Sequence, residues 1–381
     1  MKVWGLLLIL ILAVAACVPI IYHYYTTLGE KQQDDFYFGV SFGQESAEEA
    51  LPLIDKVKNY TNIFLINSWS VTTNETALNL VCDYAAKADL KFLVYFDFIS
   101  RVAFPWHQAW LDNASQRWGD KFLGVHLHDE WGGKQIENTA IVTNATDYSD
   151  AASKFVRSIQ SYNSTIDAKN KGIKLFTSDF ALYWWDYLAG YDTVFAELGW
   201  NLSTTQQIAL CRGAANMQGK DWGAIVTWKT DNPPYLANGE EIYGDMVSAY
   251  RAGAKYVIVF NYPKYPQDNP YGILTDDHFT AMQNFWSYIH AYPRSTYGTV
   301  DAQAVLVLPK DYGWGMRRSQ YIVQDKIWGL WFEDEKAPLI LNNVNKLDAK
   351  FNLQLDIIYE DARFTYGGKY RYVYFWNSTI T

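Results

Sequence analysis

The stretch Phe122–Gly133, with the sequence FLGVHLHDEWGG, decides the fold class that we expect for this chain. Its first half is apolar, as is typical of a strand buried on both faces. It then runs directly into Asp129, Glu130 and Trp131 before it stops at a glycine pair. Buried carboxylates are costly without partners, but the carboxyl ends of the strands carry the active site of a parallel α/β barrel. We therefore interpret this stretch as the fourth strand of such a barrel; the alternative is a capped strand end at which Asp129 starts the next loop.

The same pattern of a short apolar strand, a polar or aromatic end and an amphipathic helix repeats about eight times between residues 36 and 295. This repeat predicts a (β/α)8 TIM barrel, because parallel strands covered by helices read as near-continuous apolar runs. The alternative is an open doubly wound sheet, but no glycine-rich phosphate loop follows any strand. The expected strands are Tyr37–Phe42, Asn62–Trp69, Lys91–Phe98, Phe122–Asp129, Lys174–Ser178, Thr193–Leu198, Gly223–Trp228 and Lys255–Asn261. The expected helices are Ser46–Lys58, Glu75–Lys87, Asp147–Tyr162, Thr204–Met217, Gly239–Ala252 and Asp276–Ala291.

The pattern restarts after residue 295 and predicts a small α/β C-terminal domain over residues 296–381. Strands are expected at Ala302–Leu308, Leu355–Tyr359 and Tyr370–Trp376. Helices are expected at Gln324–Phe332 and Leu339–Phe351. Three or so strands with two helices are enough for a domain that packs beside the barrel.

The first 35 residues predict a membrane anchor followed by a polar tether. Val3–Tyr22 is twenty residues without a charge and follows Lys2, so its length fits a spanning helix with the N-terminus inside. Two alternatives are a signal peptide cut near Ala15-Ala16 and lipoprotein processing at Cys17. We expect a single-pass protein of the cell membrane with the bulk of the chain outside the cytoplasm, or a secreted or lipid-anchored protein if the segment is processed.

Composition limits the classes of partner. The net charge of -9 argues against a nucleic-acid partner, which requires a basic patch. Cys82 and Cys211 fall in helices on opposite sides of the expected barrel, so we predict no disulfide. Seven Asn-x-Ser/Thr sequons are consistent with an exported glycoprotein, at Asn59, Asn74, Asn113, Asn144, Asn163, Asn201 and Asn377.

Acids, amides and aromatic residues follow the expected strands, and these are the groups that glycan cleavage requires. The best catalytic pair is Glu130 on the fourth strand and Glu197 on the sixth, with Asp129 as the nearest rival. Glu197 lies in the apolar run VFAELGW, which predicts a raised pKa and the role of general acid. The expected substrate-binding residues are Asn67, Trp69, Tyr95, Asp97, His128, Trp131, Asp179, Tyr183, Trp228, Lys229, Asn261 and Tyr262.

Two alternatives concern these same residues. Glu197 could instead pair with Lys229 inside the barrel, which would make it structural. His126, His128 and Glu130 alternate, so on a strand they would share one side and could hold a metal ion. The chain has only six histidines, however, and no other expected strand end adds a histidine or cysteine. We therefore expect neither a metal nor another cofactor.

The motifs GVHLHDE, AELGW and TWK on the fourth, sixth and seventh strands resemble those of glycoside-hydrolase-like (β/α)8 barrels of archaeal surface proteins. The segments VLVLPKDYGWG and LDIIYED resemble the small α/β domain that follows the barrel in some of those chains. The largest glycosidase clan carries an Asn-Glu pair on the fourth strand, whereas this chain has Asp129-Glu130, and Lys229 stands where that clan places its nucleophile. The resemblance implies an O-glycosyl hydrolase acting on a carbohydrate. The second hypothesis is a non-catalytic surface protein that binds glycan or supports the cell envelope.

Overall fold

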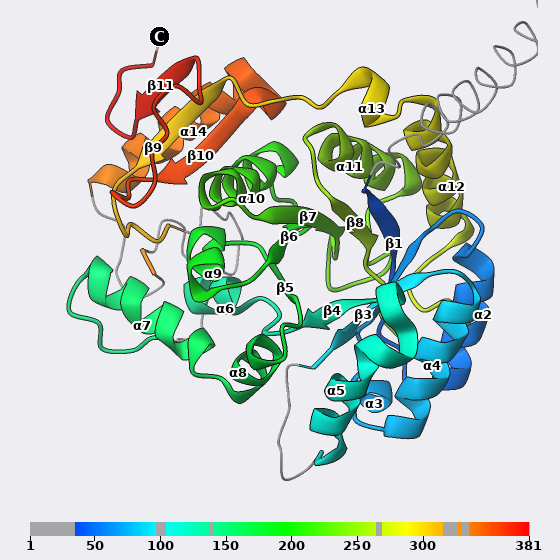
Figure 1. Cartoon of the computed structure of the whole chain (residues 1–381). Coiled ribbons are helices and arrows are strands. Elements are labelled where there is room, and N and C mark those ends of the chain that lie inside the picture. The colour runs from blue at the N-terminus through cyan, green and yellow to red at the C-terminus, as the bar shows by residue number, and fades with distance from the viewer. Residues whose placement is uncertain are drawn as a thin grey trace, which may run out of the picture.

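The computed structural model describes residues 35–96, 104–137, 141–263, 269–314, 327–328 and 335–380. Eight parallel strands close into a barrel in chain order, with β1 hydrogen-bonded to both β2 and β8 (Figure 1). This arrangement confirms the predicted TIM barrel. The strands are β1 Tyr37–Phe42, β2 Ile63–Ile66, β3 Lys91–Tyr95, β4 Phe122–His126, β5 Leu175–Asp179, β6 Thr193–Leu198, β7 Asp221–Val226 and β8 Tyr256–Val259.

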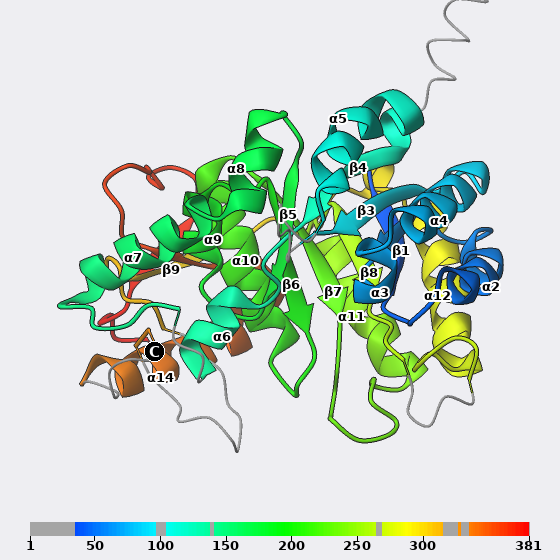
Figure 2. The same ribbon diagram turned by 90° about the horizontal axis from the view of Figure 1, so that it is seen from below.

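Helices surround the barrel on its outer side (Figure 2). All six helices expected in the barrel region are present, and α4 and α12 have the expected bounds. The helices are α2 Ala47–Val57, α3 Trp69–Thr72, α4 Glu75–Lys87, α5 Trp106–Trp118, η1 Gly119–Lys121, α6 Trp131–Glu137, α7 Tyr148–Gln160, α8 Asn163–Asn170, α9 Tyr183–Ala189, α10 Thr204–Gln218, α11 Gly239–Arg251, α12 Asp276–Ala291 and α13 Arg294–Tyr297. The sequence reading missed α5 and α8, whose apolar stripes are weaker than those of α2 and α7.

The barrel interior is a packed core of alternating inward-facing side chains, as is usual for this architecture. Phe195 from β6 contacts Phe176 and Tyr256, with ring centroids 5.9 and 5.8 Å apart. The members of this core are Ile63, Leu65, Leu93, Phe176, Phe195, Ile225, Tyr256 and Ile258. A second, larger apolar layer lies between the strands and the surrounding helices. The interior layer closes the barrel below the polar strand ends, so a ligand site inside the barrel has to lie above this layer.

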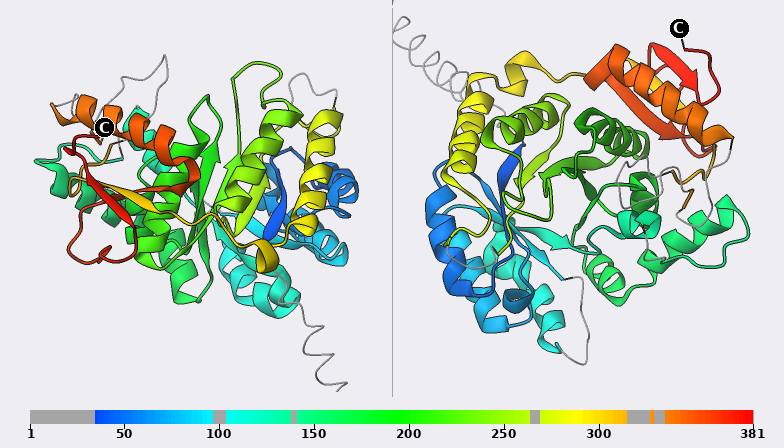
Figure 3. Two further views of the ribbon diagram at one scale, coloured as in Figure 1. Left: turned by 90° about the horizontal axis from the view of Figure 1, so that it is seen from above. Right: turned by 180° about the vertical axis from the view of Figure 1, so that it is seen from behind.

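A second sheet of three parallel strands follows the barrel, in the order β10-β9-β11. Its elements are β9 Ala304–Leu308, α14 Lys336–Phe351, η2 Asn352–Gln354, β10 Leu355–Tyr359 and β11 Tyr372–Phe375. The sheet lies beside α10, and α14 packs on it (Figure 3). All three strands expected after residue 295 are thus present. Of the expected helix Gln324–Phe332, the structure describes only Ile327 and Trp328, and Ile327 instead forms an isolated bridge with Trp314.

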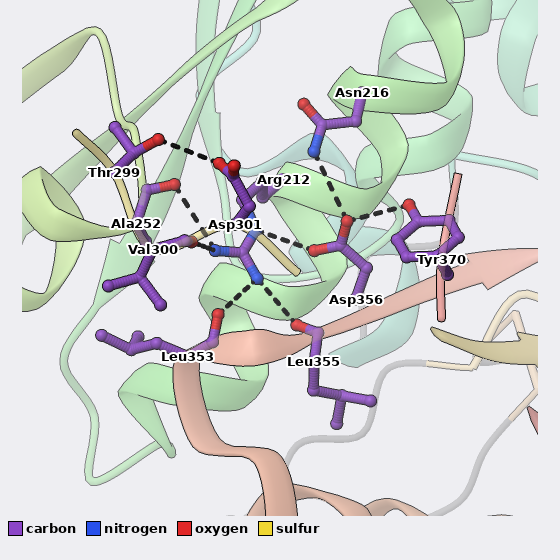
Figure 4. Close-up of polar contacts among 10 residues, drawn as sticks. All are labelled: Arg212, Asn216, Ala252, Thr299, Val300, Asp301, Leu353, Leu355, Asp356 and Tyr370. Atoms are coloured by element: carbon purple, nitrogen blue, oxygen red, sulfur yellow. Dashed lines mark hydrogen bonds and ion pairs between the residues drawn. The ribbon is translucent and has the colours of Figure 1, made fainter. Parts of the chain in front are cut away.

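A buried ion pair joins the barrel to the small sheet. Arg212 on α10 donates from Nε to Asp356 Oδ1 on β10 at 2.7 Å, and both side chains are buried (Figure 4). The other guanidinium donors reach backbone carbonyls, including those of Val300 at 3.1 Å and Leu355 at 2.9 Å. Tyr370 donates to the second carboxylate oxygen of Asp356 at 2.9 Å. Because every donor of the guanidinium has an acceptor, the pair ties the barrel to the small sheet without an unsatisfied charge.

Some of the predictions concern residues outside the described ranges, and others can be compared with the structure. The segment Val3–Tyr22, for which we expect a membrane anchor, lies outside the described residues. Among the described residues no helix is long and apolar enough to cross a membrane. Cys82 and Cys211 are free and buried. Strand β4 ends at His126 rather than Asp129, because His128 and Glu130 have φ angles of 54° and 57° and turn the chain. The expected shared side of His126, His128 and Glu130 is therefore wrong.

Candidate active site

A cavity of about 700 Å³ opens at the carboxyl ends of the barrel strands, and it brings eight of the predicted site residues together. They are Asn67, Trp69, Tyr95, Asp129, Glu130, Glu197, Trp228 and Tyr262. Further lining residues, which are not among the predicted catalytic or substrate-binding residues, include Gln44, Glu45, His126, Ser178, Trp200, Asp231 and Tyr235. Trp200 follows Glu197 by three residues in the same motif, which is a signal that the sequence did contain.

Glu130 and Glu197 form the chemical centre of the cavity. Their carboxyl groups, which come from the ends of β4 and β6, are joined by a hydrogen bond. Glu197 is only 3% exposed, and burial raises the pKa of its carboxyl well above the usual value. The negative charges of Glu130, Asp129 and Asp179, and the hydrogen bond to Glu130, raise this pKa further. Two carboxyl groups in such contact share one proton, because a like charge at this distance disfavours double ionisation.

The backbone around Glu130 holds this side chain at the cavity wall. The Glu130 amide donates to the carbonyl oxygen of Ser178 at 2.9 Å, which keeps the turn beside β5. The Glu130 carbonyl oxygen accepts from the Lys134 amide at 2.7 Å and so begins the hydrogen bonding of α6. Glu130 therefore lies between a strand end and a helix start, where these bonds limit the movement of its backbone.

Asp179 does not line the cavity, although the sequence suggested it as a substrate contact. It is buried at the end of β5 and accepts backbone hydrogen bonds from Gly132 at 2.5 Å and Gly133 at 2.7 Å. It also accepts from Phe180 at 2.8 Å and from Ala181 at 3.2 Å. A carboxylate at a helix start satisfies free amides and interacts well with the helix dipole. The function of Asp179 is thus to hold the first turn of α6, directly after Glu130.

The glycine pair of the opening stretch is required by this packing. A Cβ atom on Gly132 would lie 2.6 Å from Asp179 Oδ2, and one on Gly133 would lie 2.0 Å from the Phe180 ring. Any larger residue would push α6 away from β5. The glycines thus allow α6 to approach the strand closely enough for Asp179 to reach its amides.

A polar chain supports the other carboxylate at the cavity. The Ser178 hydroxyl donates to Asp129 Oδ1 and lies 3.2 Å from His126 Nε2. Burial lowers the pKa of His126, so its ring is neutral near neutral pH. Asp129 is thus oriented by a hydroxyl rather than by a cation, and it stays available to a ligand.

The remaining predicted site residues have other contacts. His128 Nδ1 lies 2.5 Å from the Tyr191 hydroxyl, and Trp131 packs on the His128 ring with centroids 4.2 Å apart. The hydroxyl of Tyr183 donates to Gln207 at 2.5 Å, and Asn261 Oδ1 accepts from the Ile273 amide at 3.1 Å. These four side chains support the loops around the cavity and do not line it. Asp97 lies outside the described residues.

Lys229 pairs with Glu241 on α11, with its Nζ 2.7 Å from the nearer carboxylate oxygen. The alternative in which Lys229 neutralises Glu197 is therefore not formed. Among the described residues no group of three or more histidine, cysteine, aspartate or glutamate side chains could hold a metal ion.

Aromatic rings form one wall of the cavity, which we call the aromatic wall. Trp228 lies at its centre, with ring centroids 5.4 Å from Phe260, 5.6 Å from Tyr262 and 5.6 Å from Tyr235. Trp200 extends the aromatic wall toward β6, and its ring centroid lies 6.5 Å from that of Trp228. Trp69, which is 57% exposed, lines the cavity at the end of β2. Trp184 and Trp185, by contrast, are buried against the small sheet, on Phe364 and Tyr359 respectively.

Comparison with known proteins does not assign the chain to a family. No family model matches the chain, and no curated protein sequence matches it. Among solved structures, the chain is similar to the endo-beta-1,4-mannanase from Thermotoga petrophila, with 9% identity, a TM-score of 0.46 and coverage of 67% of this chain and 77% of that one. It is also similar to the endo-1,4-beta-xylanase from Caldicellulosiruptor owensensis (12% identity, TM-score 0.42, 67% and 98% covered) and to a 3-hexulose-6-phosphate synthase (13% identity, TM-score 0.38, 66% and 99% covered). These proteins differ in reaction, so the likeness carries no argument about activity.

Proposed function

We propose that the protein is a glycoside hydrolase-like enzyme that cleaves a polysaccharide or glycan with Glu130 and Glu197. The observation that carries this proposal is the contact between these two carboxyl groups at the cavity wall. A pair of carboxyl groups with different protonation states is what glycosidic cleavage requires. The raised pKa of Glu197 makes it the proton donor, which leaves Glu130 for the role of nucleophile.

In the first step Glu197 gives its proton to the glycosidic oxygen, and the bond from this oxygen to the anomeric carbon breaks. The Glu130 carboxylate attacks the same carbon, so the leaving sugar departs as an alcohol and a glycosyl ester forms on Glu130. In the second step Glu197, now a carboxylate, takes a proton from water. The resulting hydroxide attacks the anomeric carbon, which frees Glu130 and restores the proton on Glu197.

The closeness of the two carboxyl groups favours this retaining route over inversion. Inverting enzymes keep their carboxyl groups about 6.5–9.5 Å apart to leave room for a water molecule, whereas retaining enzymes keep them about 5–5.5 Å apart. A hydrogen-bonded pair leaves no room for that water. We expect the Glu130 side chain, which is half-buried, to rotate away from Glu197 when a sugar enters between them.

The rest of the cavity supports a sugar ligand. The aromatic wall around Trp228 offers ring faces on which the C–H faces of sugars stack, and Asn67 and Tyr95 offer polar groups for sugar hydroxyls. The loops after β7 and β8 are where many barrels of this architecture bind phosphate. Here the described part of these loops lines the cavity with Trp228, Asp231 and Tyr262 and with no cation, which disfavours a sugar phosphate.

The experiment that tests the proposal is hydrolysis of a broad panel of polysaccharides by the full chain, beside Glu130→Gln and Glu197→Gln. We expect an activity that both variants lose while their thermal unfolding stays cooperative. An activity that survives both substitutions would remove this pair and direct attention to Asp129. With an activated aryl glycoside whose leaving group needs no proton, Glu197→Gln should keep far more activity than Glu130→Gln, because only the nucleophile is then essential.

A non-catalytic glycan-binding protein is the second candidate. One observation favours it: in the structure the carboxyl groups of Glu130 and Glu197 touch, which is closer than the spacing of a working retaining pair. If this candidate is correct, we expect no polysaccharide to be cleaved and glycan binding to be unchanged in Glu130→Gln and Glu197→Gln. We also expect glycan binding to weaken when Trp228 is replaced.

We also propose that the protein acts outside the cytoplasm and that its N-terminal segment anchors it in the cell membrane. The asparagines of all seven sequons are exposed, which is a requirement for glycosylation in the folded state. Removal of N-glycans from the protein purified from its natural host should increase its mobility on a denaturing gel. An unchanged mobility and a cytoplasmic location after fractionation would contradict this proposal.

A further inference from the structure

The cavity is acidic throughout the part of its wall that the structure describes. Five carboxylate side chains line it, from the ends of β1, β4, β6 and β7, namely Glu45, Asp129, Glu130, Glu197 and Asp231. Among the described residues, no lysine or arginine lines it. The lining histidine, His126, contributes no charge near neutral pH because burial lowers its pKa.

Two lysines close to this wall in the described part of the chain are engaged elsewhere. Lys229 bonds to Glu241 on α11, and Lys134 Nζ donates to the backbone carbonyl oxygen of Asp129 at 2.6 Å. Ser178 and Ser70 are the described donors to the side chains of Asp129 and Glu45. Both donors are neutral hydroxyl groups, so these two contacts bring no positive charge to Asp129 or Glu45.

A second observation points to a ligand with hydrogen-bond donors. Glu197 lines the cavity, and its buried Oε2 atom has no hydrogen-bond partner in the described part of the chain. His126 also lines the cavity, and its buried Nδ1 atom has no hydrogen-bond partner among the described residues. A buried acceptor without a partner is unfavourable, and a ligand can satisfy it only with an N–H or O–H group. An anionic ligand would bring further acceptors and a like charge.

We propose that the cavity binds a glycan whose sugars carry free, protonated amino groups. The inference rests on the proposed function for the location and for the glycan nature of the ligand. An ammonium group brings three donors and a positive charge to the carboxylates, while the carbon face of the same ring stacks on the aromatic wall. A uronic acid, sulfated or phosphorylated chain would instead meet at least three carboxylates at short range without a described cation.

The test compares three oligosaccharides of equal length by isothermal titration with the full chain at mildly acidic pH. They are a glucosamine oligomer with free amines, the same oligomer fully N-acetylated, and a galacturonic acid oligomer. We expect the amine-bearing oligomer to bind roughly tenfold or more tightly than the acetylated one, and the acidic oligomer to show no binding. The advantage of the amine should shrink at high salt, because screening weakens charge attraction.

Matched variants separate this cavity from the general acidity of the protein. Glu45→Gln and Asp231→Asn should each reduce the preference for the amine by several-fold, because each removes one carboxylate from the wall. Glu240→Gln removes an exposed carboxylate on α11 outside this cavity and should change nothing. Equal losses in all three variants would overturn the inference. It would also be overturned if the acetylated or the acidic oligomer bound as tightly as the amine-bearing oligomer or more tightly, or if none of the three oligomers bound.

The outcome stays distinct from that of the hydrolysis experiment. Cleavage of an uncharged polysaccharide that is lost in Glu130→Gln, with no preference for amines, would keep the proposed function and overturn this inference. Selective binding of the amine-bearing oligomer without cleavage of any substrate would support this inference and remove the hydrolase.

Discussion

Asp179 at the end of β5 accepts a hydrogen bond over 2.7 Å from the backbone amide of Gly133, in the first turn of α6. A second bond of 2.5 Å reaches the amide of Gly132. Glu130 directly precedes this helix, so the contact fixes the chain on the C-terminal side of a proposed catalytic residue. The position of Glu130 therefore depends on a carboxylate that never faces the cavity.

Gly133→Ala tests this dependence. The added Cβ would lie 2.0 Å from the Phe180 ring, so α6 or Phe180 has to move. We expect a loss of about 1–3 kcal/mol in the free energy of unfolding, which is typical of overpacking. The matched control is Gly244→Ala in α11, where a Cβ meets nothing within 4 Å and helix propensity predicts a gain of about 0.5–1 kcal/mol. Chemical denaturation measures both, and equal effects would contradict the packing argument.

Asp186→Asn tests a buried carboxyl pair behind the site. Burial, the charge of Asp179 and a hydrogen bond to Asp179 raise the pKa of Asp186 well above its usual value, so the folded protein holds a proton on this pair. The unfolded chain releases that proton above about pH 4. The stabilising contribution is therefore complete below this pH and is lost as the pH rises through the raised pKa, by about 1.4 kcal/mol per pH unit for one proton.

The asparagine variant keeps a donor to Asp179 but has no proton to lose, so the decline of stability with rising pH should become shallower. Urea denaturation at a series of pH values measures this slope. Asp276→Asn, on the exposed start of α12, is the control and should keep the slope of the parent protein. An unchanged slope in Asp186→Asn would show that the pair is not protonated in the folded state.

The fold could be predicted from the sequence because its periodicity is carried by many residues at once. Strands β1 and β6 have the predicted bounds, since both are largely apolar runs that are followed directly by a glycine, Gly43 or Gly199. The expected end of β4 was wrong because His128 and Glu130 adopt left-handed backbone angles, which residues other than glycine adopt uncommonly. The expected bounds of β2, β3 and β8 also extended too far, because aromatic residues beyond the strands look like strand residues.

The catalytic pair could be proposed from strand positions alone, but the function of Asp179 could not. Asp179 and Gly133 are 46 residues apart, and no local pattern shows that the end of β5 meets the start of α6. Likewise, Lys229 follows β7 as a site residue would, yet its side chain turns outward to Glu241. The direction of a side chain after a strand end depends on the loop conformation, which sequence periodicity does not contain.

Arg212→Met tests the connection between the barrel and the small sheet. The substitution leaves Asp356 buried without its cation, so we expect a loss of about 3–5 kcal/mol in unfolding free energy. Lys171→Met removes the partner of Asp112 at the surface and should cost less than about 1 kcal/mol. Arg212→Met/Asp356→Leu removes both buried charges and should recover part of the loss. Similar losses for the buried and the surface variant would contradict the proposed contribution of the pair.

Trp69→Ala tests the aromatic lining without disturbing the core, because this side chain is 57% exposed. Loss of one stacking platform should weaken glycan binding by roughly three- to tenfold, in line with about 0.5–1.5 kcal/mol for an aromatic contact. Tyr297→Ala on α13 removes an equally exposed ring far from the cavity and should leave binding unchanged. Titration with the tightest-binding oligosaccharide of the panel measures both, and equal weakening would show that Trp69 is not a platform.

Glu197→Gln should separate stability from activity. The folded protein keeps Glu197 protonated because burial raises its pKa, whereas the unfolded chain ionises this group above about pH 4. The carboxyl therefore costs stability increasingly as the pH rises toward its raised pKa, by about 1.4 kcal/mol per pH unit. Glutamine keeps the shape and can donate to Glu130, so the variant should be more stable than the parent at neutral pH while it loses hydrolysis. Glu240→Gln on the surface should change neither property. A variant less stable than the parent at neutral pH would mean that Glu197 is ionised in the fold and cannot be the proton donor.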